Sequence, residues 1–174
     1  MRILMILISD TDPDYRHSDR PMQLVRFLAP YYVFSDAGLD VVLASREGGA
    51  PWTRPEIADP QISSQILRRF KTDRSAREAL NDTLSLDQID ISDFAAAFCV
   101  GAPGSIWHDA DANSSASIIA RFLDDGRPVA VTPGIFDLTP FGARDGMLII
   151  GQSLDAPALA ANALLAILKD KSAS

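Results

Sequence analysis

The sequence predicts a single α/β domain with a mainly parallel sheet and helices on both faces. Short apolar segments of strand length alternate with longer helical patterns along all 174 residues, which is the order found in parallel α/β proteins. The first segment, Ile3–Ile8, is continuously apolar, as is typical of a central strand that is covered on both faces. No repeat or low-complexity linker interrupts residues 1–174, so we expect one domain.

The other elements are expected in the same alternation. Pro21 is a good first residue for a helix, and Gly38 is expected to end that helix as a C-cap. The stretch Ser45–Pro60 contains two adjacent glycines and three prolines, so we predict a long loop there. Further strands are predicted at residues 41–44, 94–100, 128–132 and 147–150, and further helices within 61–84, 113–125 and 156–169.

The charge balance argues against polyanionic partners. The chain has 16 basic and 23 acidic residues and a net charge of -7, which is the wrong sign for a general nucleic-acid binder or a binder of anionic membranes. The basic residues between positions 61 and 84 are interpreted as a solvated helical face, with a polyanion site as the alternative.

Composition also indicates the compartment. The single cysteine, Cys99, excludes an intramolecular disulfide and fits a reducing environment. The apolar segment Met1–Ile8 is interrupted by Arg2 and followed at once by polar residues, so it is too short for a signal sequence or a membrane span. We therefore expect a cytoplasmic protein without a membrane partner.

Polar residues follow three of the predicted strands, and the site is expected around Thr132. In doubly wound α/β proteins, ligands bind at the carboxyl ends of the strands. A carboxylate with a histidine can act as general acid and base for hydration, elimination or isomerisation. The candidate catalytic residues are Asp10, Asp12, His17 and His108, and the candidate substrate-binding residues are Thr132, Gly101, Ala102 and Trp107.

Each candidate also has an ordinary structural explanation. Asp10 and Asp12 are suited to capping turns, the two histidines to exposed positions, and Trp107 to packing under a loop. The Asp and His residues do not follow the spacing of a known ligand motif, so no metal site is predicted, and no cofactor is expected.

Several stretches of the sequence resemble a known superfamily. These stretches are RILMILIS, PYYVFSDAGLDVVLASREGGAP, FAAAFCVGAPGSIWHDADAN, GRPVAVTPG and DGMLIIGQSLDAPALAANALLAIL. In this order they resemble the DJ-1/PfpI (ThiJ) superfamily, in particular its branch of chaperone-like and glyoxalase III-type proteins. The resemblance implies a flavodoxin-like three-layer sandwich that is commonly dimeric. The aromatic residues Tyr31, Tyr32, Phe34 and Trp52 also suggest exposed apolar surface for a homodimer.

The catalytic residues that the resemblance implies are replaced in this chain. The family's nucleophilic cysteine, and the histidine after it, fall on Thr132 and Pro133. Its acidic partner falls near Val25 or Arg26, and neither is acidic. A β-branched residue before proline favours extended backbone over the strained nucleophile turn, and Pro133 has no N–H to serve as an oxyanion donor. Cys99 lies in an apolar strand and is interpreted as a core residue.

Three functions are consistent with this sequence. The first is an enzyme that uses the ancestral pocket for non-covalent acid/base chemistry on a small oxygenated metabolite. The second is a non-catalytic protein that binds such a molecule and signals through a partner. The third is a holdase-like chaperone that works through exposed apolar surface. A ligand bound beside Thr132 would distinguish the first two functions from the third.

Overall fold

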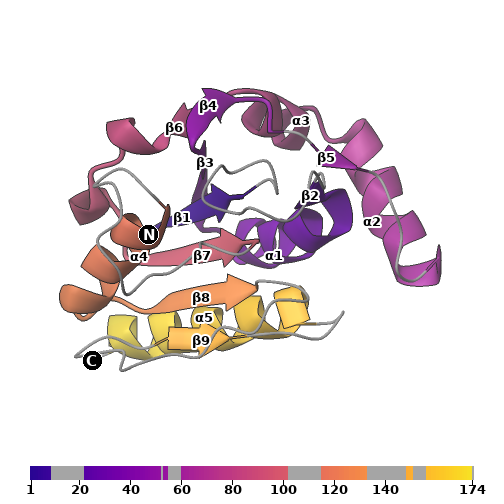
Figure 1. Ribbon diagram of the computed structural model, residues 1–174. Coiled ribbons are helices and arrows are strands. Elements are labelled where there is room, and N and C mark those ends of the chain that lie inside the picture. Colours follow the sequence, from indigo (N-terminus) through magenta and orange to yellow (C-terminus); the bar gives the residue numbers. More distant parts are fainter. Residues whose placement is uncertain are drawn as a thin grey trace.

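The computed structural model describes residues 1–8, 22–51, 53–54, 60–101, 115–132, 148–150 and 156–173 (Figure 1). The elements follow one another in chain order as β1 (Arg2–Leu7), β2 (Met22–Gln23), α1 (Leu24–Asp36), β3 (Asp40–Ser45), β4 (Glu47–Gly49), β5 (Thr53–Arg54), α2 (Pro60–Thr72), α3 (Arg74–Asn81), β6 (Thr83–Ser85), two 3₁₀ turns (Leu86–Gln88 and Ile91–Asp93), β7 (Ala96–Val100), α4 (Ser115–Asp124), β8 (Val129–Thr132), β9 (Leu148–Ile150) and α5 (Ala156–Ala173).

The main sheet has seven strands in the order β4-β6-β3-β1-β7-β8-β9. All neighbouring pairs in it are parallel except β4 with β6, which is antiparallel. Strands β2 and β5 form a separate parallel pair. The order of β3, β1, β7, β8 and β9 is that of a flavodoxin-like sheet, which confirms the predicted α/β class with a mainly parallel sheet.

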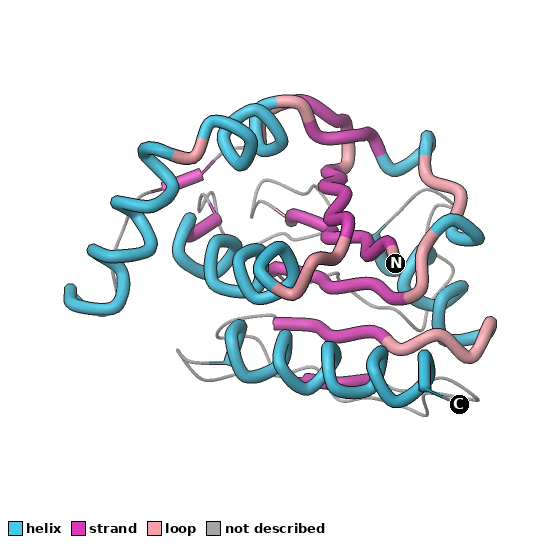
Figure 2. The backbone as a smooth tube through the Cα atoms, turned by 180° about the vertical axis from the view of Figure 1, so that it is seen from behind, coloured by secondary structure: helices cyan, strands magenta, loops and turns pink. Residues whose placement is uncertain are grey.

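Two hydrophobic cores make the fold a three-layer sandwich. Along β1 the side chains alternate, so that Ile3, Met5 and Leu7 join one core while Leu4 and Ile6 join the other. The first core contains residues of α1, α3 and α5, and the second contains residues of α4 and the 3₁₀ turns. Figure 2 shows α1 and α5 together in the view from behind. A strand that is buried on both faces requires a continuous apolar sequence, which β1 has.

Some boundaries differ from those predicted. Helix α1 begins at Leu24, after the short strand β2, and not at Pro21, which lies outside the described residues. The predicted loop Ser45–Pro60 contains β4 and β5. Backbone pairing of β4 with β6 and of β5 with β2 orders these short segments, which their composition does not reveal. Within the described residues, no helix is long and apolar enough to cross a membrane.

The aromatic residues of α1 are not surface residues. Tyr31, Tyr32 and Phe34 are buried in the first core of the same chain, so the expectation that they offer exposed aromatic surface is wrong. Helices α2 and α3 cover this region: Arg69 lies over the Tyr32 ring, with its guanidinium carbon 3.7 Å from the ring centroid, and Tyr32 Oη donates to Asp73 at 3.2 Å. Trp52 lies outside the described residues.

Candidate functional site

The candidate site lies where the strand order of the sheet reverses. From β1 the chain passes through α1 to β3 on one side, and later strands β7, β8 and β9 continue on the other side. The arrowheads of β1, β7 and β8 point the same way in Figure 1, so their carboxyl ends share one edge. Ligands of doubly wound sheets bind in the crevice at this reversal point. The relevant edge is therefore formed by Ile8, Gly101 and Thr132.

Gly101 packs directly against the end of β1. The Ile8 N–H donates to the carbonyl of Val100 at 2.9 Å, which brings the two strand ends together. Gly101 has a φ of +105°, and a Cβ at this position would lie 2.8 Å from the Ile8 carbonyl oxygen and 2.9 Å from the Ile8 Cβ. Only glycine fits both the left-handed backbone and the close approach. The backbone at Gly101 is thus in close contact with Ile8 at the end of β1.

Thr132 ends strand β8 in extended conformation. It pairs with Val100 in the parallel register of β7 and β8, as the sequence predicts for a β-branched residue before proline. Its side chain is fully buried, and Oγ1 donates to the carbonyl of Cys99 at 3.2 Å. The Thr132 hydroxyl therefore joins two strands, and contact of Thr132 with a ligand stays a prediction.

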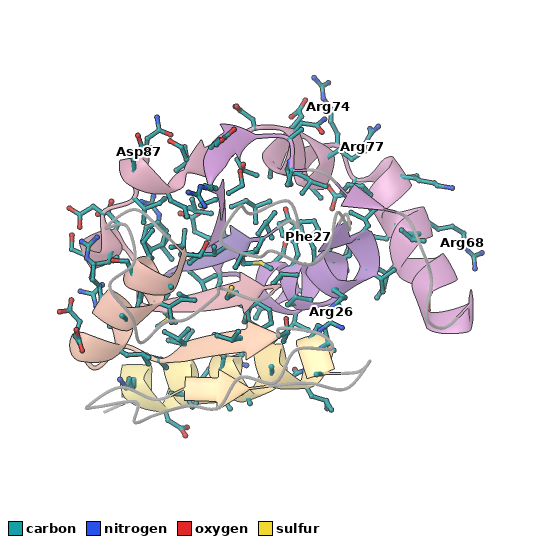
Figure 3. All side chains as sticks on the ribbon, in the orientation of Figure 1. Arg26, Phe27, Arg68, Arg74, Arg77 and Asp87 are labelled. Atoms are coloured by element: carbon teal, nitrogen blue, oxygen red, sulfur yellow. The ribbon has the colours of Figure 1, made fainter. Side chains whose placement is uncertain are left out.

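The carbonyl of Thr132 connects three elements. It accepts a hydrogen bond from the Gly101 N–H at 3.2 Å and another from Nη2 of Arg26, also at 3.2 Å. Arg26 is half-buried in the first turn of α1. Figure 3 shows it beside the arrowhead of β8. A positively charged side chain thus reaches the edge where the candidate site lies.

Arg26 is the residue that sequence reasoning missed. The resemblance places the family's acidic partner near Val25 or Arg26, and from the sequence alone this position only lacks that acid. The signal that could have pointed to Arg26 is its position in the chain. A side chain at this place in α1 faces the end of β8, whether it is acidic or basic. The structure places the guanidinium of Arg26 there, 3.2 Å from the Thr132 carbonyl oxygen.

Cys99 has the environment of a core residue. It lies within β7 and is fully buried, and its Sγ lies 3.7 Å from the carbonyl oxygen of Gly101. Burial raises the pKa of the Cys99 thiol far above its usual range, because a thiolate loses its hydration in an apolar interior. The thiolate is the nucleophilic form, so Cys99 is unsuited to nucleophilic catalysis.

The remaining predicted site residues lie outside the described part of the chain. Their convergence at the edge therefore stays a prediction. Among the residues that the structure describes, no three His, Cys, Asp or Glu side chains are grouped so that they could hold a metal ion. The residues outside the described ranges are Asp10, Asp12, His17, Ala102, Trp107 and His108.

Comparisons with solved structures identify the fold. Glyoxalase III from Candida albicans matches with a TM-score of 0.67 at 15% identity, over 95% of this chain and 96% of that one. The rapid encystment protein of 24 kDa from Francisella tularensis matches with a TM-score of 0.64 at 14% identity, over 94% and 97%. A ThiJ/PfpI domain protein from Brachyspira murdochii matches with a TM-score of 0.60 at 15% identity, over 97% and 96%.

These likenesses show that the chain has the fold of the DJ-1/ThiJ/PfpI domain proteins. No protein-family model matches the sequence, and neither does any curated protein. The three structures named above are 14% or 15% identical to this chain. Function must therefore be argued from the residues at the edge of the sheet.

Proposed function

We propose that this chain, which has the DJ-1/ThiJ/PfpI fold, binds a small oxygenated metabolite at the carboxyl edge of its sheet and acts on it by non-covalent acid/base chemistry. The observation that carries the proposal is the arrangement at the end of β8. There Gly101 and Arg26 both donate to the Thr132 carbonyl, at the point where the strand order reverses. This arrangement joins three elements at the position where ligands bind in doubly wound sheets.

A thiol-dependent mechanism is not part of the proposal. Cys99 is buried and its pKa is raised, while the Thr132 hydroxyl is buried and bonded to the Cys99 carbonyl. Pro133, the next residue, has no N–H to stabilise an oxyanion. The likeness to a glyoxalase III supports an enzymatic use of this fold, but the chain must carry out its chemistry without a covalent cysteine intermediate.

Proton transfer is assigned to the loops that follow β1 and β7. In this proposal one of Asp10, Asp12 and His17 acts together with His108, since a carboxylate or imidazole can remove a proton beside a carbonyl or hydroxyl group and return it elsewhere. The reaction types that need only this chemistry are hydration, elimination and isomerisation. Gly101, Ala102, Trp107 and Thr132 are proposed to line the bound molecule.

A non-catalytic small-molecule binder is the second candidate. The same contacts at Gly101 and Thr132 support it, and it requires no proton-transfer group. A chaperone-like role receives less support, because within the described residues the exposed large apolar side chains are Met1, Leu84 and Leu159. Met1 precedes β1, Leu84 lies in β6 and Leu159 lies in α5, whereas a surface that holds unfolded chains needs a contiguous apolar patch.

The proposal includes a cytoplasmic homodimer. The single cysteine supports the compartment, and the dimer comes from the family resemblance alone, since the aromatic residues of α1 are buried within one chain. Sedimentation at micromolar concentration tests the dimer. A monomer at that concentration would contradict it.

The proposal is tested by measuring binding and turnover of small hydroxy and oxo compounds. Asp10→Asn, Asp12→Asn, His17→Ala and His108→Ala are compared with the wild type. We expect at least one of the first three substitutions, and His108→Ala, to reduce turnover while thermal stability changes little, as is usual for surface-loop substitutions. Binding without turnover in the wild type would favour the second candidate. Unchanged turnover in all four variants would contradict the acid/base assignment.

A further inference from the structure

We propose that two copies of this chain associate through the outer face of helix α3, with the two helices antiparallel about a two-fold axis. The inference rests on the homodimer of the proposed function, for which it supplies the surface. It starts from the order of charges along α3. Arg74 and Arg77 lie in the amino-terminal half of the helix, whereas Glu78 lies in the other half and Asp82 is the C-cap residue. A face with this order is complementary to a reversed copy of itself.

The charged residues of α3 form one exposed face. Ala76 and Leu80 are buried in the first core, so the opposite side of the helix points away from the sheet. Figure 3 shows Arg74 and Arg77 projecting outward. Residues three or four apart on a helix are neighbours on its surface, so the charges follow one another along a single stripe. The exposed residues of α3 and its C-cap are Arg74, Ser75, Arg77, Glu78, Asn81 and Asp82.

A shallow hollow lies at the acidic end of this face. Its two carboxylates and the negative end of the helix macrodipole both favour a positively charged group there. A guanidinium suits the place, because its planar donors match a carboxylate. In the antiparallel pair, the arginines of each copy reach the hollow of the other. The hollow is lined by Glu78, Ala79, Asn81 and Asp82.

The ion pair within α3 is compatible with this pairing. Arg74 Nε lies 2.7 Å from Glu78 Oε1, and the two side chains are 83% and 63% exposed. An exposed pair of this kind contributes little to stability, and a carboxylate can accept hydrogen bonds from more than one guanidinium. Glu78 can therefore keep Arg74 of its own chain and also receive Arg77 of the second copy.

Helix α3 is held in place before any partner arrives. Its N-cap residue is Asp73, whose Oδ1 accepts from the Ala76 N–H at 3.0 Å. The other carboxylate oxygen of Asp73 accepts from Tyr32 Oη of α1 at 3.2 Å. A surface that is ordered beforehand loses less conformational entropy on association. The charged face of α3 is therefore presented in a fixed position.

Charges of both signs on one short helix favour a second copy over other partners. A nucleic acid or a strongly acidic protein would be repelled by Glu78 and Asp82, and a strongly basic protein would be repelled by the two arginines. The partner that fits has the reverse order of charges. The same face of another copy has that order by symmetry, so we assign a second copy as the occupant.

Charge reversals in the full-length chain test this surface by sedimentation equilibrium. We expect Arg77→Glu and Glu78→Arg each to raise the dimer Kd by about 10-fold or more, since like charges then meet twice across the two-fold axis. Arg77→Gln removes the charge without reversing it and should weaken the dimer by a smaller factor. Lys169→Glu makes the same change in net charge as Arg77→Glu at an exposed position of α5 and should leave the Kd unchanged.

A mixture of the two reversals provides the most specific arm of the test. Arg77→Glu and Glu78→Arg proteins are combined in equal amounts. They should associate with about the affinity of the wild type, because the acidic side chain introduced at position 77 then faces the basic one introduced at position 78. The double variant should dimerise for the same reason. Thermal unfolding of each variant is expected to match the wild type, as is usual for exposed positions.

The possible outcomes separate this surface from the rest of the proposed function. A monomeric wild type would overturn both the surface and the homodimer. A dimer that both reversals leave unchanged would overturn the surface alone. A Kd raised as much by Lys169→Glu as by Arg77→Glu, or a mixture that fails to associate, would also overturn the pairing through α3. Ligand binding at the edge of the sheet is measured separately and does not depend on these results.

Discussion

The Oγ1 hydroxyl of Thr132 donates a hydrogen bond of 3.2 Å to the carbonyl oxygen of Cys99 in the neighbouring strand. Both side chains are fully buried. The Thr132 hydroxyl and the Cys99 backbone are thus part of the contact between β7 and β8. Their part in this contact supports the proposal of a site that works without a nucleophile from either residue.

The bond between Thr132 and Cys99 should contribute to stability. Thr132→Val keeps the shape of the side chain but removes the hydroxyl, and we expect a loss of about 1 kcal/mol in the free energy of unfolding. Thr132→Ser keeps the hydroxyl and serves as the matched control for the bond. Urea unfolding measures the free energy of unfolding of both variants and of the wild type. A larger loss for Thr132→Ser than for Thr132→Val would show that the methyl group, and not the bond, matters here.

Close packing at Gly101 gives a second prediction. Gly101→Ala introduces a Cβ 2.8 Å from the Ile8 carbonyl oxygen, so overpacking should add about 1–3 kcal/mol of destabilisation to the backbone strain. Gly38 also has a positive φ, of +77°, but a Cβ there would meet nothing within 4 Å. Gly38→Ala therefore measures the strain alone. Equal losses in the two variants, measured by thermal unfolding, would mean that β1 yields to the new methyl group.

Tyr32 makes stability depend on pH in the alkaline range. Burial, together with the nearby negative charge of Asp73, raises the pKa of Tyr32 from 10 to about 12. Between these values the unfolded chain loses a proton that the folded chain retains, so the free energy of unfolding falls as pH rises. The contribution of neutral Tyr32 to the free energy of unfolding is fully present below pH 10. Tyr32→Phe removes this titration.

The comparison of wild type with Tyr32→Phe isolates the effect, because the other titrating groups are common to both proteins. The stability difference between them should be largest below pH 10 and should shrink toward pH 12. Urea unfolding at several pH values measures this difference. If the difference stays constant across the range, the raised pKa of Tyr32 is not supported.

The buried thiol of Cys99 should be unreactive. In the native protein at neutral pH, an aromatic disulfide reagent should modify Cys99 only as fast as the chain unfolds, because the thiolate is suppressed by burial. The protein should also show no cysteine-dependent turnover of methylglyoxal, with Cys99→Ala as the control. Robust turnover that this substitution abolishes would contradict the assignment of Cys99 to the core.

Much of the fold follows from apolar patterning. The continuous run Ile3–Ile8 predicted β1, and Ala156 was correctly expected to begin the last helix. Strands β4 and β6 were not predicted, because three-residue strands such as Thr83–Ser85 are too short for a periodic signal. Their order comes from tertiary contacts, including the buried hydrogen bond of 2.8 Å between the Ser45 and Thr83 hydroxyls.

Less of the site was predictable. Topology placed Gly101 and Thr132 at one edge, because the strands that carry them end there. The contact between Arg26 and the Thr132 carbonyl depends on how α1 packs across the sheet, which no local sequence pattern records. The direction of the Thr132 hydroxyl depends in the same way on the register of β8 against β7. Long-range geometry of this kind appears only in the folded chain.

The most direct test of the central claim is to locate the ligand site in solution and to remove the thiol. A panel of small hydroxy and oxo compounds is titrated into ¹⁵N-labelled wild type and Cys99→Ala. We expect the largest amide shifts at the carboxyl ends of β1, β7 and β8, including Ile8, Gly101 and Thr132, with the same affinities in both proteins. Shifts confined to other parts of the chain, or binding that disappears in Cys99→Ala, would contradict a thiol-independent site at this edge.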